Sequence, residues 1–210
     1  MSLKSEFTDG MAHLPNLHEN IKTTDEIVVY RGGKPYRITA SEFLGGYKLI
    51  GYFDYNDAAT TESPISVSAD TPTILTNDTL GEFSTTQYKP SRITRLWNPQ
   101  TNRFDFSELN IGDMVDIRID LNITTTNTYQ EVSVDINMGL GQAGAYSIPI
   151  IPHNVLKSVD DYKILQLTSV HIGNTLTKDN PASITITTDA NASVVVHGWY
   201  LKVSSRLNDV

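Results

Sequence analysis

The sequence predicts an all-β fold in which antiparallel strands form a sandwich or a barrel. Residues 113–124 alternate strictly, with apolar side chains at 115, 117, 119, 121 and 123 and polar ones between them. Successive side chains of a strand point to opposite faces, so this segment is a strand with one buried and one wet face. Similar short segments follow to the C-terminus, separated by turn residues, and this spacing is typical of sandwiches and barrels.

Length and composition limit the fold and exclude several functions. The chain of 210 residues can bury one core and carry a small appendage, and without cysteine it has no disulfides and no thiolate zinc site. A formal net charge of -8 argues against nucleic acid and anionic membranes as partners. No apolar run approaches the about 18 residues of a membrane span, so we expect no membrane insertion. The N-terminus lacks a signal-peptide core, which predicts synthesis in a cytoplasm or export without a signal.

The first 46 residues predict an arm followed by a small module. Residues 1–24 are polar and show no period, as expected for an extended arm. Short β runs at 27–30 and 35–39 flank a glycine turn, a capping box at 39–42 predicts one helical turn over 41–44, and Gly45 and Gly46 end it. Two strands and one helical turn are not stable alone, so we expect this module to dock on another protein. Its predicted anchoring residues are Ile27, Val29, Tyr30, Tyr36 and Ile38.

Residues 47–210 are predicted to form a single β domain. Helix is nearly absent, with at most one turn over 154–160. The expected strands lie near residues 47–53, 64–68, 72–76, 92–97, 113–124, 130–138, 145–151, 162–172, 182–188 and 193–204.

The last strand is apolar at consecutive positions and therefore on both faces. Val194, Val196 and Tyr200 alternate with apolar partners on the opposite face. A strand of this kind must be covered on both sides, whereas a sandwich core covers only one. We predict that the second face forms a subunit interface, with a covering loop as the alternative. The predicted interface residues are Val195, His197, Trp199 and Leu201.

Sequence motifs for catalysis or cofactor binding are weak. Residues 139–144 match a Gly-x-Gly-x-x-Gly pattern, but the prolines and β-branched residues of 145–152 cannot form the helix that phosphate binding requires. A flexible turn is the better interpretation. Asp54, Asn56 and Asp57 suit calcium in a turn, although the rest of a calcium loop is missing. No nucleophile elbow is present, so we predict a protein that is not an enzyme and has no cofactor or metal.

Aromatic residues near turns are the better functional indicator. Aromatic side chains that reach the surface stack on sugars and anchor interfaces, although most of those in this chain should pack in the core. Tyr55, Tyr129 and Tyr146 lie near predicted turns, so we expect them to be accessible and to contact a glycan if the protein binds one.

The order of these parts resembles the accessory virion proteins of tailed bacteriophages. The arm and the hairpin at residues 28–39 come first, as in head fibres, capsid decoration proteins and tail-fibre subunits. Residues 109–120 and the closing strand at 194–203 are similar to C1q/TNF-like jelly rolls. The resemblance implies an antiparallel jelly-roll β-sandwich, a homotrimer, and an N-terminal segment that binds other virion proteins. It brings no catalytic residues, and fold alone does not specify function.

The expected function is therefore that of a non-enzymatic structural protein located in the virion. A head fibre or capsid decoration protein is favoured, because the chain is short for a tail fibre and has no shaft-like repeat. The alternative is a carbohydrate- or receptor-binding module of a tail fibre, or a lectin-like protein, that recognises a host surface glycan. A polysaccharide depolymerase would need a longer chain or a β-helix.

Overall fold

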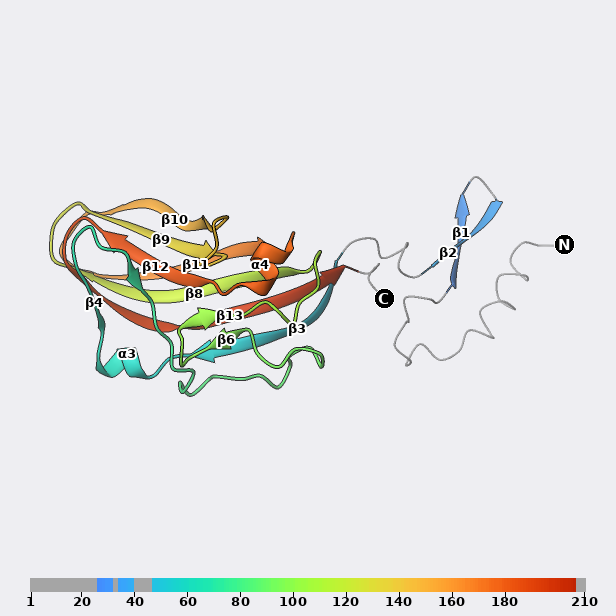
Figure 1. The fold of residues 1–210 in the computed structure, drawn as a ribbon, viewed down its shortest axis with the longest axis horizontal. Coiled ribbons are helices and arrows are strands. Elements are labelled where there is room, and N and C mark those ends of the chain that lie inside the picture. Colours follow the sequence, from blue (N-terminus) through green and yellow to red (C-terminus); the bar gives the residue numbers. More distant parts are fainter. Residues whose placement is uncertain (1–25, 32–33, 40–46, 207–210) are drawn as a thin grey trace, which may run out of the picture. The chain divides into compact units, whose positions relative to one another are not determined.

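A computed structural model describes residues 26–31, 34–39 and 47–206, which belong to two compact units (Figure 1). In the first unit, β1 (Glu26–Arg31) and β2 (Lys34–Thr39) pair as an antiparallel hairpin, as the sequence predicts. The predicted arm over 1–24, the glycines of the hairpin turn, and the helical turn with its two terminal glycines lie outside the described residues.

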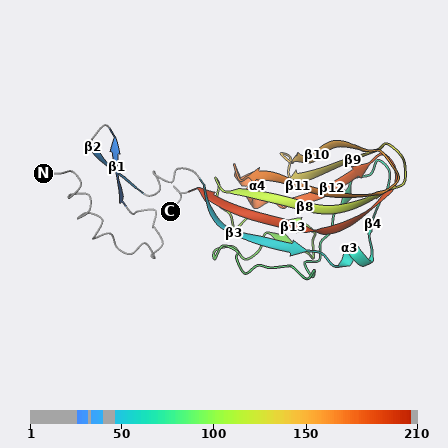
Figure 2. The same ribbon diagram turned by 180° about the vertical axis from the view of Figure 1, so that it is seen from behind.

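The second unit, Tyr47–Arg206, is an antiparallel sandwich of two sheets, which Figure 1 and the reverse view in Figure 2 show stacked face to face. One sheet has the strand order β11-β8-β13-β3, with β4 added beside β13, and the other has the order β10-β9-β12-β5. The chain crosses repeatedly between the two sheets in the manner of a jelly roll, which confirms the predicted fold class. The bounds are β3 (Tyr47–Asn56), β4 (Ile65–Val67), β5 (Thr73–Ile74), β8 (Met114–Thr125), β9 (Gln130–Met138), β10 (Tyr146–Leu156), β11 (Asp161–His171), β12 (Ser183–Thr188) and β13 (Ala192–Arg206).

Two predicted elements are wrong, and two short helices were not predicted. The segment 92–97 is a loop, closed by the Ile93 N–H donating to the Pro90 carbonyl, that ends in the small hairpin of β6 (Trp97–Asn98) and β7 (Arg103–Phe104). Its apolar side chains enter the core without forming a ladder. Residues 154–156 complete β10 in place of a helical turn. The helices α3 (Ala59–Glu62) and α4 (Thr175–Asp179) lie in connections.

The core fills the space between the two sheets. The five apolar residues of β8 predicted to face inward are all fully buried, opposite the inward residues of β9. Aromatic rings close one side of this core. The rings of Trp97 and Phe104 lie 4.8 Å apart between centroids, and those of Trp97 and Trp199 lie 5.7 Å apart, all in edge-on contact.

A β-bulge interrupts β13 at His197. Along β8, Val196 pairs with Leu121 and Gly198 pairs with Asp120, so His197 is an extra residue on β13. One extra residue reverses the face taken by every side chain that follows it. The apolar residues on either side of the bulge therefore point to the same face, the core. These are Val194 and Val196 before it, and Trp199, Leu201 and Val203 after it.

The bulge overturns part of the predicted subunit interface. Trp199 and Leu201 have no exposed surface in the single chain, so they belong to the core and cannot contact a second subunit. Val195 and His197 are only half-buried and keep their place on the outer face. The bulge brings apolar residues from both halves of the last strand into the core, while Val195, His197 and Tyr200 stay half-buried on the outer face.

The loop that contains α3 completes the hydrogen bonding at the bulge. On this side β13 pairs with β4 up to Val194 and with β3 from Gly198 onward, which leaves the residues between them unpaired. The Thr60 hydroxyl accepts from the Val196 N–H (2.8 Å) and donates its one proton to the Asp57 carboxylate (2.6 Å), with the Val196 carbonyl oxygen 3.0 Å from the same hydroxyl. The Asp57 N–H donates to the His197 carbonyl (3.0 Å). Buried backbone groups without partners would be costly, so these bonds make the bulge stable.

Replacing Gly198 with Ala should destabilise the sandwich. A Cβ atom at this position would lie 2.6 Å from the backbone oxygen of Tyr55 on β3, a contact that requires the two strands to separate. We expect the free energy of unfolding in urea to fall by about 1–3 kcal/mol, as for other overpacked sites.

Gly173→Ala is the matched control for this substitution. Its Cβ would meet only the exposed side chain of His171, at 3.2 Å, which can move away. We expect a change within about 0.5 kcal/mol. Equal effects of the two substitutions would contradict the close approach of β13 to β3 at the bulge.

Candidate functional site

The predicted anchoring residues lie on the β1–β2 hairpin. Ile27 pairs with Ile38, and Val29 pairs with Tyr36, so four of the five predicted positions stand directly opposite one another. The fifth, Tyr30, pairs with Pro35. Contact between these residues and a particle stays a prediction.

The jelly roll receives and releases the chain at a single end. Tyr47, the first residue of β3, pairs with Arg206, the last residue of β13. The opposite end carries the connections around α3, between β8 and β9, between β10 and β11, and between β12 and β13, as Figure 1 shows. One end of this unit is therefore joined to the rest of the chain, and the far end carries loops.

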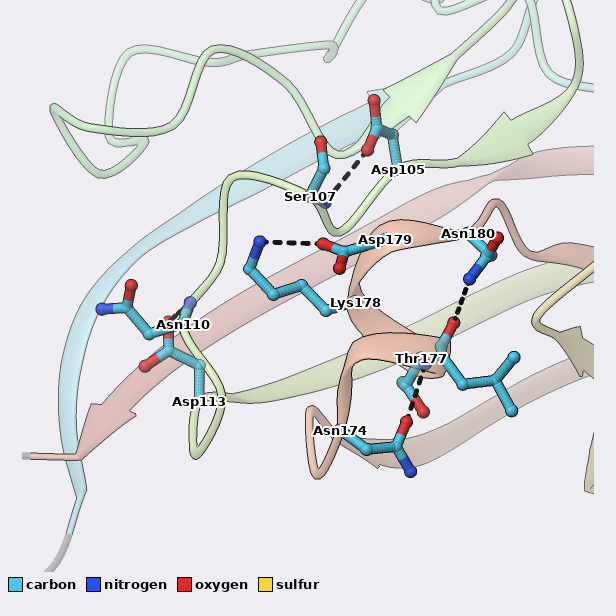
Figure 3. Close-up of polar contacts among 10 residues, drawn as sticks. Asp105, Ser107, Asn110, Asp113, Asn174, Thr177, Lys178, Asp179 and Asn180 are labelled. Atoms are coloured by element: carbon cyan, nitrogen blue, oxygen red, sulfur yellow. Dashed lines mark hydrogen bonds and ion pairs between the residues drawn. The ribbon is translucent and has the colours of Figure 1, made fainter. Parts of the chain in front are cut away.

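A buried carboxylate ties together the segments at the joined end (Figure 3). Asp113 at the start of β8 accepts from the Arg92 guanidinium (2.6 Å), the Asn110 N–H (2.9 Å) and the Ser205 hydroxyl (2.6 Å). These partners come from a loop, from the turn before β8 and from the end of β13. Both carboxylate oxygens of Asp113 accept hydrogen bonds from groups of the protein itself. Asp113 is therefore a structural residue and not a ligand-binding one.

The strand β11 exposes two leucines at the edge of the larger sheet. Leu165 and Leu167 are 55% and 60% exposed, and no described strand pairs with the far edge of β11. Ile164 and Tyr162 on its other face pack against the core. β11 therefore carries apolar side chains on both of its faces, the arrangement that the sequence predicted for the last strand. An apolar, unpaired edge is a surface that favours association with another chain.

Charged and aromatic side chains continue this surface across the sheet. In register, Leu165 stands beside Asp120 and Leu167 beside Arg118. The Arg118 guanidinium lies 5.1 Å from the centre of the Tyr200 ring, a cation–π contact. We call these five residues, Leu165, Leu167, Arg118, Asp120 and Tyr200, the outer-face patch.

Two buried oxygen atoms at this patch lack hydrogen-bond donors. Oδ1 of Asp120 and Oδ1 of Asn122 are inaccessible to water and have no partner within the part of the chain that the structure describes. The other carboxylate oxygen of Asp120 lies 3.8 Å from Nζ of Lys163. An unpaired buried acceptor costs about 1–3 kcal/mol, so these two oxygens are a local cost of the fold on β8.

The neighbouring carboxylate of Asp116 differs, because its partners are within the chain. It accepts from the Ser169 hydroxyl (2.6 Å) and pairs with the Lys202 ammonium (2.9 Å). Partial burial alone would raise the pKa of Asp116, but these hydrogen bonds and the Lys202 charge hold it below its usual value. The unpaired acceptors are thus a local property of Asp120 and Asn122.

Tyr55, one of the three predicted glycan contacts, is buried, so that prediction is wrong. It is 5% exposed, and its hydroxyl accepts from the Leu96 N–H (3.0 Å), which fixes the loop before β6. Burial raises the pKa of Tyr55 to about 12. The reason is that β3 extends to Asn56, so the predicted turn at residue 55 is still a core strand.

The other two predicted glycan contacts are accessible but far apart. Tyr129 is 68% exposed, and Tyr146 is 40% exposed with its hydroxyl 2.8 Å from the Thr177 hydroxyl. Tyr146 pairs with Met138 at one end of the β9–β10 hairpin, whereas Tyr129 precedes Gln130 at the other end. They cannot belong to one binding site.

The sequence motifs weighed for metal or phosphate have structural roles. The Asp57 carboxylate accepts from the Thr60 N–H (2.7 Å), from the Thr60 hydroxyl (2.6 Å) and from the Asp78 N–H (2.7 Å), so its oxygens are occupied by the protein's own donors. Gly139 and Gly141 adopt positive φ angles of 68° and 82° in a turn that leads into β10, as predicted for a flexible turn.

The residues that the structure describes contain neither a metal-binding cluster nor a membrane-spanning helix. Among them, no group of three or more His, Asp or Glu side chains is placed to hold a metal ion. None of the helices in the same ranges has the length and apolar character needed to span a bilayer.

A polar hollow lies between the β6–β7 hairpin and α4 and was not predicted. Its volume is about 370 Å³, and Figure 3 shows its polar neighbourhood. Asp105 accepts from the Ser107 N–H (3.0 Å), and Asp179 pairs with the Lys178 ammonium (3.0 Å). The lining residues are Asn98, Thr101, Arg103, Phe104, Asp105, Ser107, Asp179 and Pro181.

Comparison with known proteins yields structural similarities of low score. No protein-family model matches the chain, and no curated protein sequence matches it. Eiger TNF from S. frugiperda is 8% identical with a TM-score of 0.44, covering 75% of this chain and 93% of that one. The PRD1 vertex protein P5 is 11% identical with a TM-score of 0.40, covering 75% and 98%. A structure of infectious bursal disease virus, Gt strain, is 10% identical with a TM-score of 0.39, covering 94% and 42%. Similarities this low leave function to be argued from the chain's own residues.

Proposed function

We propose that the chain is a non-enzymatic structural protein of a virion, attached to the particle by residues 1–46 and displaying its jelly roll as a homotrimer. The observation that carries this proposal is that the jelly roll receives and releases the chain at one end. A unit joined at one end and free at the other suits display on a surface. A head fibre or capsid decoration protein of a tailed bacteriophage is the specific form we favour.

The N-terminal unit supports attachment to another protein. A two-stranded hairpin buries little apolar surface and is marginally stable in isolation. The described hairpin of β1 and β2 would gain stability by docking on a larger surface, with Ile27, Val29, Tyr30, Tyr36 and Ile38 as the proposed contacts.

The outer-face patch supports self-association of the jelly roll. Contact with a second copy would remove the exposed side chains of Leu165 and Leu167 from water. Val195 lies beside Asn122 in register on the same face, so this predicted interface residue fits the same contact. The chain has no cysteine, so disulfides between subunits are excluded, and an exposed apolar patch can supply the contact.

The alternative function is that of a receptor-binding module that contacts host glycan with its far end. Tyr129 supports it, because this exposed side chain sits on a backbone with a φ angle of 58°. A bulky residue in the left-handed region is uncommon and is often retained for function. The two functions are compatible in one protein.

The trimer and its contact surface can be tested by light scattering. We expect the purified chain to have three times its monomer mass of 23.3 kDa. The double substitution Leu165→Asp and Leu167→Asp places charges in the proposed contact and should yield monomers. Leu80→Asp is the matched control, because Leu80 is 76% exposed and lies in a loop outside the patch. A monomeric wild type, or equal disruption by the control, would refute this contact.

Attachment can be tested with virus particles that lack the protein. The full chain should sediment with the particles, whereas residues 47–210 should stay in the supernatant and still form trimers. Asp substitutions at Val29 and Tyr36, which pair on the hairpin, should weaken sedimentation in the full chain. Binding of residues 47–210 at the level of the full chain would show that the anchor lies elsewhere.

A further inference from the structure

We propose that the hollow between the β6–β7 hairpin and α4 binds a sugar that carries a carboxylate, with Arg103 receiving that group. This inference goes beyond the virion proposal and does not depend on it. The starting observation is a cavity of about 370 Å³ that polar side chains line together with Phe104 and Pro181, all from segments 98–107 and 179–181. Cavities from about 300 Å³ upward accommodate small ligands, and this one is near the lower limit.

The guanidinium of Arg103 has no anionic partner among the residues that the structure describes. It donates to the carbonyl of the neighbouring Asn102 (3.3 Å), and none of the carboxylates in the described ranges pairs with it. The side chain is half-buried in the wall of the hollow. A partly desolvated guanidinium favours an anion, and its planar fork binds a carboxylate through two parallel hydrogen bonds.

The two carboxylates of the hollow already have partners. Oδ1 of Asp105 accepts from the Ser107 N–H, and Oδ1 of Asp179 pairs with Lys178. Their negative charges repel any anion, but they repel a doubly charged phosphate more strongly than a singly charged carboxylate. The charge pattern therefore favours a carboxylate over a phosphate dianion beside Arg103.

The remaining groups suit the hydroxyls of a sugar. The Asn98 amide oxygen accepts from the Gln100 N–H (3.1 Å), which leaves the amide nitrogen as a donor. The Thr101 and Ser107 hydroxyls add groups that donate and accept, and Pro181 offers an apolar surface to the C–H face of a ring. Alternating donors and acceptors around a single cation match a carboxylated sugar better than an apolar acid.

The walls of the hollow are fixed before any ligand enters. Phe104 and Ala182 exchange backbone hydrogen bonds of 2.8 and 3.1 Å, which hold the hairpin against the strand that follows α4. The helix is capped by Asn174, which accepts from the Thr177 N–H (2.9 Å) (Figure 3). The Tyr146 hydroxyl bonds Thr177 as well. A fixed site loses less conformational entropy on binding.

The test is an NMR titration of the full chain with N-acetylneuraminic acid, glucuronic acid, glucose and inorganic phosphate. We expect at least one of the acidic sugars to shift the backbone signals of residues 98–107 and 179–181, and to bind more tightly than glucose and phosphate. Arg103→Gln should weaken this binding about tenfold or more, since it removes a charge-assisted pair. Arg103→Lys keeps the positive charge but lacks the planar pair of N–H donors, so it should weaken binding less than Arg103→Gln does.

Arg95→Gln is the matched control, because Arg95 is exposed in the loop before β6 and does not line the hollow. It should leave the affinity unchanged. The proposal is overturned if neither acidic sugar binds, if glucose or phosphate binds as tightly, or if Arg103→Gln binds like the wild type. A folded Arg103→Gln spectrum with lost binding separates a site effect from unfolding.

Discussion

The jelly roll depends on how β13 is held between its neighbours. This strand of 15 residues pairs with β8 on one side and with β3 and β4 on the other, and the bulge at His197 lies in the middle of it. The extra residue lets apolar side chains on both halves of the strand enter one core. Thr60 and Asp57 supply the hydrogen bonds that the bulge would otherwise lose, so the loop with α3 is part of the same arrangement. The bulge also decides which surfaces stay available, because it removes Trp199 from the outer face.

Local patterns predicted the strands well and their register less well. The alternation in 113–124 is explicit because β8 itself carries no bulge. The extra residue lies on β13, opposite Leu121 and Asp120, and alternation alone does not reveal it. Gly198 was the available signal, since a glycine inside a strand often marks a bulge or a close backbone approach. In β11, where Ile164 and Leu165 are adjacent in sequence, the outer face is apolar but exposed in the single chain, and its cover by another copy is our proposal.

The functional surfaces were harder to predict because they join distant segments. Tyr55 seemed to follow a strand, but β3 continues through it and its hydroxyl fixes a loop 41 residues away. The hollow beside α4 combines residues near 100 with residues near 180, and α4 itself has no apolar period that would reveal it. Accessible groups without partners in the described residues support the proposals in both places: the leucines of the outer-face patch, and the guanidinium of Arg103. Each is stable in water at a cost that a partner would remove.

The central claim is that the outer-face patch and β11 are covered by other copies of the chain in solution. Hydrogen–deuterium exchange tests it directly, because β11 and β10 are the edge strands of the two sheets on the same side of the sandwich. In the assembled protein, the backbone amides of Asp161–His171 should exchange more slowly than those of Tyr146–Leu156, and the Leu165→Asp, Leu167→Asp variant should lose that difference. Equal exchange of the two edges in the wild type would contradict the account.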